Sequence, residues 1–197
     1  SLTDPERWDG QIDELAVWSR RLSASEVLYN YNLQYGRIGH WAFSETTANT
    51  APGGADFSDA GPFGLHASES TVVGYDQIGV VGTAVSITGD GNGIIIPNND
   101  LIHTTEEVSF GGWVKFDDLS ANQYIIDNQQ GLNGWMLERW GTNLQAAIQT
   151  SSGGFRTASY PVSNLYVDEW YHVVGTYKNG EGIKLYLNGV NVATTAA

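Results

Sequence analysis

The sequence predicts an all-β protein in which two antiparallel sheets stack as a sandwich. Short runs of alternating apolar and polar residues recur at intervals typical of sandwich strands. The 197-residue chain contains 24 glycines, which suits many short strands joined by tight turns. Apolar residues make up 41% of the chain, enough to fill the core of one large domain. No long segment shows the periodicity of an amphipathic helix, so an α/β fold is excluded.

Residues 1–37 differ in sequence pattern from residues 38–197, and we expect a boundary between two segments of the chain there. In residues 10–18 (GQIDELAVW), apolar side chains fall on both faces of an extended chain, as in a strand inside a sandwich. Ser23 is followed three residues later by Glu26, which is a capping box. A short helix is therefore expected near residues 24–31.

The second segment opens with a predicted strand at residues 38–43. Residues 44–64 are rich in Gly, Pro, Ser, Thr and Asp, which is typical of a long loop. Two Asn-Gly pairs, at residues 179–180 and 188–189, are hairpin signals between alternating runs. Further strands are expected near residues 84–87, 93–96, 107–116, 123–128, 134–140, 143–149, 155–160, 169–178, 182–187 and 190–195.

Alternation in residues 107–116 (EVSFGGWVKF) assigns side chains to two faces of a strand. The even-numbered positions form an apolar face that consists of Val108, Phe110, Gly112, Val114 and Phe116. Ser109, Trp113 and Lys115 lie on the other face. Residues 183–187 alternate in the same way. Two stacked sheets about 10 Å apart account for both patterns.

The charge of the chain excludes several classes of partner. Nine Lys and Arg residues stand against 22 Asp and Glu, which gives a formal charge of −13. Such a surface repels nucleic-acid backbones and anionic membranes. The sequence contains no cysteine, so disulfides and thiolate sites are excluded. No apolar run is long enough to insert into a membrane, and no signal peptide is evident. We expect the chain to be a piece of a longer protein.

Five motifs occur in an order that is found in a known family. They are WAFSE, DAGPFGLHA, GTAVSITGDGNGIIIP, EVSFGGWVKF and DEWYHVVGTYKNGEGIKLYLNGV. Together they resemble the laminin-G-like, concanavalin-A-like jelly-roll domains, which include pentraxin relatives. The resemblance covers residues 38–197. It implies a jelly-roll sandwich in a secreted or cell-surface protein, with a role in binding or adhesion.

The run RWDGQIDELAVWSRRLSASEV resembles the closing strand and helix of the same family, but it stands at the start of this chain. A module without its last strand would leave an open sheet edge and uncovered apolar side chains. We therefore expect residues 3–31 to complete the sandwich of residues 38–197. Pairing in cis is favoured because the link at residues 32–37 is short. A strand-swapped homo-oligomer is the alternative.

The resemblance also implies a calcium ion. In similar domains a Ca²⁺ joins an Asp after the first strand to the closing strand, and the matching residues here are Asp59 and Asp13. Calcium takes six to eight oxygen ligands, and loop carbonyls would supply the remainder. Alternatively, the two carboxylates accept hydrogen bonds from turn amides.

Aromatic residues near loops are candidates for binding sugars, which stack their apolar ring faces on aromatic rings. The candidate platform residues are Trp135, Trp140, Tyr124, Tyr160 and Tyr166. Trp41, Trp113 and Trp170 sit inside strand patterns and are expected in the core, and His172 is expected to be structural. A carbohydrate, or alternatively an extracellular protein, is the expected ligand.

Catalysis is not expected. Glucanases of this architecture place carboxylates on one strand face, whereas the adjacent pairs Asp13-Glu14 and Glu106-Glu107 point to opposite faces. No nucleophile elbow, zinc-protease motif or phosphate loop occurs. The sequence therefore predicts a non-catalytic carbohydrate-binding module. The alternatives are a structural or protein-binding repeat without a glycan ligand and, third, a glycoside hydrolase.

Overall fold

The computed structural model describes residues 37–70, 73–88, 93–103, 106–128, 134–149 and 154–196. Residues 38–197 form one compact unit. The expected closing strand at residues 10–18 and the expected helix near residues 24–31 lie outside the described residues. Their pairing with the sandwich, in cis or by swapping, stays a prediction.

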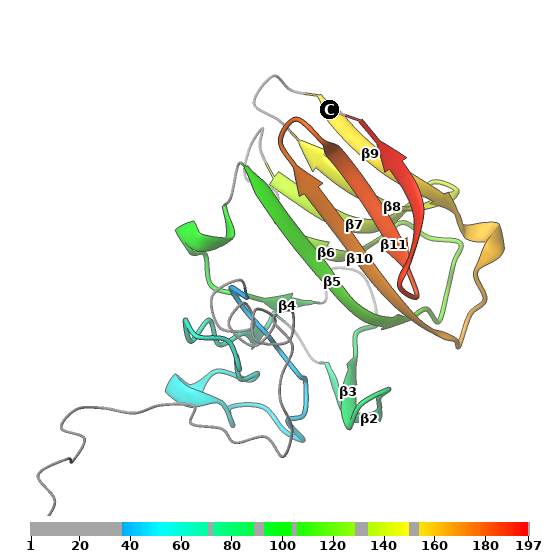
Figure 1. Cartoon of the computed structure of the whole chain (residues 1–197). Coiled ribbons are helices and arrows are strands. Elements are labelled where there is room, and N and C mark those ends of the chain that lie inside the picture. The colour runs from blue at the N-terminus through cyan, green and yellow to red at the C-terminus, as the bar shows by residue number, and fades with distance from the viewer. Residues whose placement is uncertain are drawn as a thin grey trace, which may run out of the picture. The chain divides into compact units, whose positions relative to one another are not determined.

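Two four-stranded antiparallel sheets stack in the described part of the chain (Figure 1). One sheet has the order β12-β11-β10-β5, with β5 (Glu107–Lys115), β10 (Trp170–Lys178), β11 (Gly182–Leu187) and β12 (Val190–Thr195). The other has the order β6-β7-β8-β9, with β6 (Gln123–Asp127), β7 (Gly134–Trp140), β8 (Asn143–Gln149) and β9 (Phe155–Pro161). The predicted all-β sandwich is therefore confirmed.

Shorter elements lie in the first part of the described chain. They are β1 (Ser68–Glu69), β2 (Gly74–Ile78), β3 (Thr83–Ser86), β4 (Ile94–Ile95) and the 3-10 turns η1 (Pro52–Gly54), η2 (Asp100–Ile102) and η3 (Val162–Asn164). The pairs are β1 with β4 and β2 with β3. None of the described helices is long and apolar enough to cross a membrane.

The strand predicted at residues 38–43 is wrong. Only Trp41 in this segment pairs, in an isolated bridge to Asp59. Phe43 has a φ of 52°, a left-handed conformation that breaks an extended chain. From β3 onward the predicted strands agree with the observed ones to within one or two residues.

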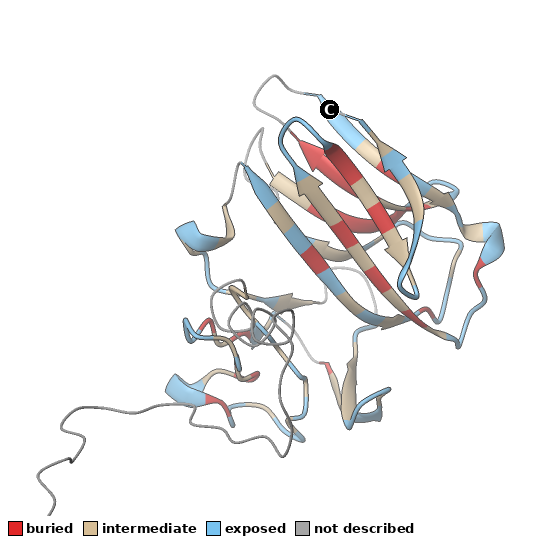
Figure 2. Ribbon diagram, viewed as in Figure 1, coloured by how far each residue is buried: buried red, intermediate tan, exposed pale blue. Residues whose placement is uncertain are grey.

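The core lies between the two sheets. Its fully buried residues include Leu137, Leu144, Val173, Ile183 and Leu185. The apolar faces predicted for residues 107–116 and 183–187 point into it. Figure 2 shows the resulting alternation of buried and less buried positions along β10.

Gly175 in β10 lies directly opposite Phe110 in β5. A Cβ atom at residue 175 would stand 2.6 Å from the Phe110 ring and 2.9 Å from the Cβ atom of Ala146. The absent side chain therefore leaves the space into which the Phe110 ring packs.

A second, smaller cluster is centred on Phe57, which is fully buried. The Phe57 ring packs edge-on against Phe43 at 5.4 Å and stacks with Tyr75 at 5.5 Å between centroids. Trp41 packs against this cluster and donates its Nε1–H to the carbonyl of Leu65. The expectation that Trp41 belongs to a core is met.

The same expectation is wrong for Trp113 and fails in part for Trp170. Trp113 is 48% exposed. It shares its strand face with Lys115, and that face points away from the core because the opposite face carries Phe110 and Val114. Trp170 is half-buried and lies opposite Lys115 on the same outer surface.

Candidate functional site

A row of four side chains crosses the sheet β6-β7-β8-β9. Tyr124 of β6 lies opposite Glu138 of β7, Glu138 lies opposite Gln145 of β8, and Gln145 lies opposite Ser159 of β9. Residues in register on adjacent strands share a face of the sheet. Leu137 and Leu144, their neighbours in sequence, point into the core. The row of Tyr124, Glu138, Gln145 and Ser159, here called the polar row, therefore lies on the outer face.

Hydrogen bonds connect the polar row. Gln145 Nε2 donates to Glu138 Oε1 at 2.7 Å, and the Ser159 hydroxyl donates to Gln145 Oε1 at 3.2 Å. Glu138 is only 5% exposed, whereas Ser159 is exposed. The amide of Gln145 is thereby fixed in orientation, and it holds the carboxylate of Glu138 in place.

An exposed aromatic pair adjoins this row. Trp140 follows Glu138 by two residues on β7 and so lies on the same face. Its ring centroid is 6.1 Å from that of Tyr124, at an interplanar angle of 43°. Tyr124 is 56% exposed and Trp140 46% exposed. Asn143 of β8 lies opposite Trp140.

The arrangement combines an apolar platform with a fixed set of hydrogen-bonding groups. Both rings are exposed to solvent, and the carboxylate, amide and hydroxyl groups of the polar row lie on the same face. A cyclic ligand that has C–H bonds on its face stacks on the aromatic platform. Hydroxyl groups on the edge of the same ligand match the hydrogen-bonding groups of the polar row.

The structure separates the five aromatic residues predicted for this site. Only Tyr124 and Trp140 come together. Trp135 stacks on Phe110 at 4.6 Å, donates its Nε1–H to the carbonyl of Ile102 and packs against the core. Tyr160 also packs against the core. Tyr166 is 67% exposed and follows η3, where its backbone N–H donates to the Tyr171 hydroxyl.

Sequence reasoning missed the three polar members of the row. Glu138, Gln145 and Ser159 stand on three different strands, and only the strand register shows that they are neighbours. The one signal in the sequence was the position of Glu138 two residues before Trp140, which places the two on one face of a strand.

Asp59 holds a loop together. Its Oδ1 atom accepts the backbone N–H groups of His40 and Gly61, both at 2.7 Å, and its Oδ2 atom accepts that of Leu65 at 2.8 Å. Burial raises the pKa of Asp59, but the three backbone hydrogen bonds, with a Coulombic contribution from His66, outweigh it and hold the pKa below its ordinary value. The carboxyl is therefore ionised at neutral pH.

These bonds leave Asp59 little capacity for a metal ion. A carboxylate offers about four lone pairs, and backbone amides occupy three of them here. The described residues contain no group of three or more His, Cys, Asp or Glu that could hold a metal. Asp13 lies outside the described residues, so the paired site stays a prediction.

A family model described as the concanavalin A-like lectin/glucanases superfamily, of laminin-G type, matches residues 88–197. The match covers more than half of the chain and includes all eight strands of the sandwich. The chain belongs to this superfamily. No curated protein matches the chain.

Solved structures similar to this superfamily member come from botulinum neurotoxins. One belongs to type C, whose cell entry is described as dependent upon interaction with two ganglioside molecules. Its TM-score is 0.64 at 18% identity, and the match covers 85% of this chain and 40% of the toxin chain. The ligand binding domain of serotype D in complex with N-acetylneuraminic acid has a TM-score of 0.60, 19% identity and coverages of 78% and 39%.

A third similar structure is the receptor binding domain of the C/D mosaic serotype, with a TM-score of 0.59, 20% identity and coverages of 71% and 36%. The chain therefore spans at most about two fifths of the structures it matches. At this level of identity the similarity shows the fold.

Proposed function

We propose that the chain is a carbohydrate-binding module and that the outer face of the β6-β9 sheet binds the sugar. The observation that carries this proposal is the exposed Tyr124–Trp140 pair beside the polar row. A sugar ring stacks on the Tyr124–Trp140 pair, and hydroxyl groups of the glycan bond to the more accessible members of the polar row, Gln145 and Ser159.

Two further observations support the proposal. The superfamily includes lectins. Of the similar toxin structures, one is described by an interaction with gangliosides and one by a complex with N-acetylneuraminic acid. A third is described as a receptor binding domain. We further propose that the module is extracellular and belongs to a longer protein.

The proposal is tested by titrating the full chain with a glycan panel while tryptophan fluorescence is recorded. Trp140→Ala should weaken binding of any glycan that the panel identifies by about tenfold, because one stacking surface is removed. Tyr166→Ala is the control, since Tyr166 is also exposed but lies after η3, outside the sheet that carries the row, and it should bind normally. Silence across the panel would instead favour a structural or protein-binding repeat.

We also propose that the module does not cleave its ligand. Residues directly opposite Glu138 are a tyrosine and a glutamine rather than a second carboxylate. Retaining hydrolysis needs two carboxyl groups about 5 Å apart. Prolonged incubation with the bound glycan should leave it intact. New reducing ends that disappear in Glu138→Gln would identify a hydrolase.

A structural calcium ion held by Asp13 and Asp59 is a separate proposal, supported by the resemblance of both motifs to the family pattern. Its test is the melting temperature in millimolar calcium against millimolar magnesium. A rise with calcium that Asp13→Ala abolishes would support the ion. Asp13→Ala is preferred to a change at Asp59, because Asp59 also holds three backbone amides.

A further inference from the structure

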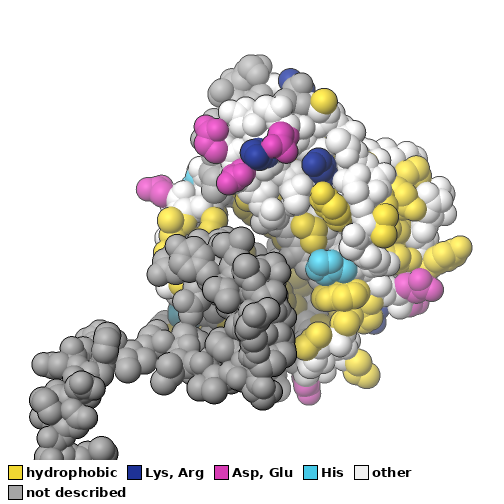
Figure 3. Space-filling model, in the orientation of Figure 1, with side chains coloured by type: hydrophobic (Ala, Val, Ile, Leu, Met, Phe, Trp, Pro, Cys, Tyr) yellow, Lys and Arg dark blue, Asp and Glu magenta, His cyan; other side chains and the backbone are white. Residues whose placement is uncertain are grey.

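The other sheet carries the lysines of the chain. Every lysine of the sequence, Lys115, Lys178 and Lys184, lies on the outer face of β5, β10 and β11. The whole chain has a formal charge of −13. In Figure 3 acidic side chains lie beside basic ones at the top of this face, and hydrophobic side chains gather below them. Lysine side chains are thus concentrated on one surface of an acidic protein, where Lys178 is paired with Glu181 and lies opposite Glu107.

A pocket of about 500 Å³ opens on this face and is lined by Trp113, Trp170, His172 and Asn188. Trp113 lies directly opposite His172, and the two ring centroids are 5.2 Å apart. Trp170 lies opposite Lys115. Side chains from β5, β10 and the turn after β11 therefore converge on one point of the sheet.

The polar wall of the pocket is rigid. Asn188 has a φ of 50° and begins the tight turn between β11 and β12, followed by Gly189 with a φ of 80°. Its backbone N–H donates to the carbonyl of His172 at 2.8 Å, and its Oδ1 atom accepts the N–H of His172 at 2.9 Å. The turn is thereby attached to β10, and the side-chain NH₂ group of Asn188 is left as a donor at the pocket.

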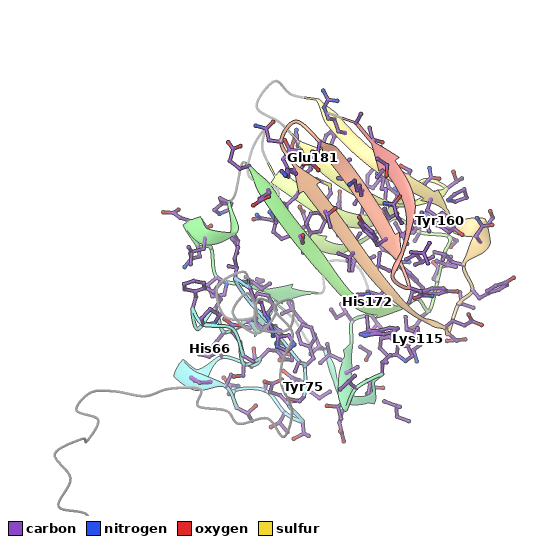
Figure 4. The ribbon with its side chains drawn as sticks, in the orientation of Figure 1. His66, Tyr75, Lys115, Tyr160, His172 and Glu181 are labelled. Atoms are coloured by element: carbon purple, nitrogen blue, oxygen red, sulfur yellow. The ribbon has the colours of Figure 1, made fainter. Side chains whose placement is uncertain are left out.

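A lysine side chain lies beside the pocket. The ammonium group of Lys115 lies 5.6 Å from the centroid of the Trp170 ring, and Figure 4 shows Lys115 and His172 near the same end of the sheet. None of the lining residues is acidic. Two of the carboxylates that flank these strand ends accept hydrogen bonds from other groups. Glu169 accepts a hydrogen bond from Tyr171, which faces the core, and Asp118 accepts two from Ser120.

We propose that this pocket binds a sugar acid, that is, a monosaccharide unit that carries a carboxylate. The sugar ring stacks on the exposed Trp113, the carboxylate pairs with the ammonium of Lys115, and Asn188 and His172 bond to hydroxyl groups. Lys115 selects the acid over a neutral sugar, because every other group at the pocket serves both. This site lies on the sheet that the proposed function does not use, so either can fail without the other.

The test is a titration of the full chain, with the indole N–H signals followed by NMR. Glucuronic acid and glucose form a matched pair of probes that differ in the carboxylate, and N-acetylneuraminic acid is a second acid. Millimolar glucuronic acid or N-acetylneuraminic acid should shift the Trp113 and Trp170 signals, and glucose should shift them less. Trp113→Ala should abolish the response.

Lys115→Gln should weaken acid binding by about threefold to fivefold and leave glucose binding unchanged. Lys184→Gln is the matched control. Lys184 lies opposite Thr176, six residues along β10 from Trp170, and Trp170 lies opposite Lys115. At 3.4 Å per residue, Lys184 is therefore about 20 Å from Lys115 along the same face. Trp140→Ala should leave acid binding intact. The proposal is overturned if neither acid shifts the two signals, if glucose binds as tightly as glucuronic acid, or if Lys115→Gln and Lys184→Gln behave alike.

Discussion

Gln145 Nε2 lies 2.7 Å from Glu138 Oε1, and this contact joins the two central strands of the proposed sugar-binding face. Glu138 is 5% exposed and needs the contact, because a buried carboxylate without a hydrogen-bond partner is costly. The hydrogen bond therefore serves stability as well as the orientation of the site.

Gln145→Ala should lower the free energy of unfolding by about 1–3 kcal/mol, because it leaves a buried acceptor without its donor. Urea denaturation measures the change. Ser159→Ala removes a neighbouring, exposed hydroxyl from the same chain of bonds, and its cost should be smaller, about 0.5 kcal/mol. Equal effects would mean that the bond to Glu138 contributes little.

Asp59→Asn should destabilise the protein by about 2 kcal/mol or more at neutral pH, because the amide group has one oxygen for three backbone donors. The pKa of Asp59 in the folded protein lies below its ordinary 3.8, so the ionised form contributes stability above that pH. This stability is lost as the pH falls through the folded pKa.

Thermal denaturation between pH 2 and pH 6 tests the pH dependence of Asp59. The difference in melting temperature between the parent and Asp59→Asn should be constant above about pH 4 and shrink below it. A difference that does not change with pH would show that the charge of Asp59 is irrelevant to stability.

Tyr75 should be among the last tyrosines to ionise. Burial, the hydrogen bond to Glu69 and the negative charges of Glu69, Asp56 and Glu45 raise its pKa to about 12. The neutral phenol is thus favoured by folding, and this contribution is present below about pH 10 and lost as the pH rises through 12. Alkaline titration at 295 nm measures ionisation, and Tyr75→Phe should remove the highest-pH phase. Loss of an earlier phase instead would contradict the assignment.

Gly175→Ala should destabilise the protein, whereas Gly112→Ala should not. A methyl group at residue 175 meets the Phe110 ring and Ala146 at under 3 Å, so it must displace a core side chain, at a cost of about 1–3 kcal/mol. At residue 112 nothing lies within 4 Å of the added atom, and alanine should be neutral or slightly stabilising. Melting temperatures of the two variants decide the matter, and comparable losses would refute the packing argument.

Local patterns predicted most of the fold because alternation and Asn-Gly turns act within a few residues. They placed β5 to β12 and the core face of Phe110 well. They failed at residues 38–43, where the left-handed Phe43 is not visible in the sequence. They missed β1 and β2, whose few residues carry no clear alternation.

The candidate sites were less predictable because they depend on register between strands. Tyr124 and Trp140 were recognised as candidates, but Trp135 has the same residue type and faces the core, stacked on Phe110. Trp113 was expected in the core although its neighbour Lys115 already marked its face as outward. The alternation along the strand is sufficient to place Trp113 on the outer face beside Lys115.

The location of the lysines has a practical consequence for any assay. Reagents that couple to side-chain amines can attach only through the outer face of β5, β10 and β11, because Lys115, Lys178 and Lys184 all lie there. On a biosensor chip, molecules coupled through a lysine side chain would hold the Trp113 pocket against the matrix and present the Tyr124–Trp140 surface to the flowing sample. Immobilisation through an affinity tag avoids this bias.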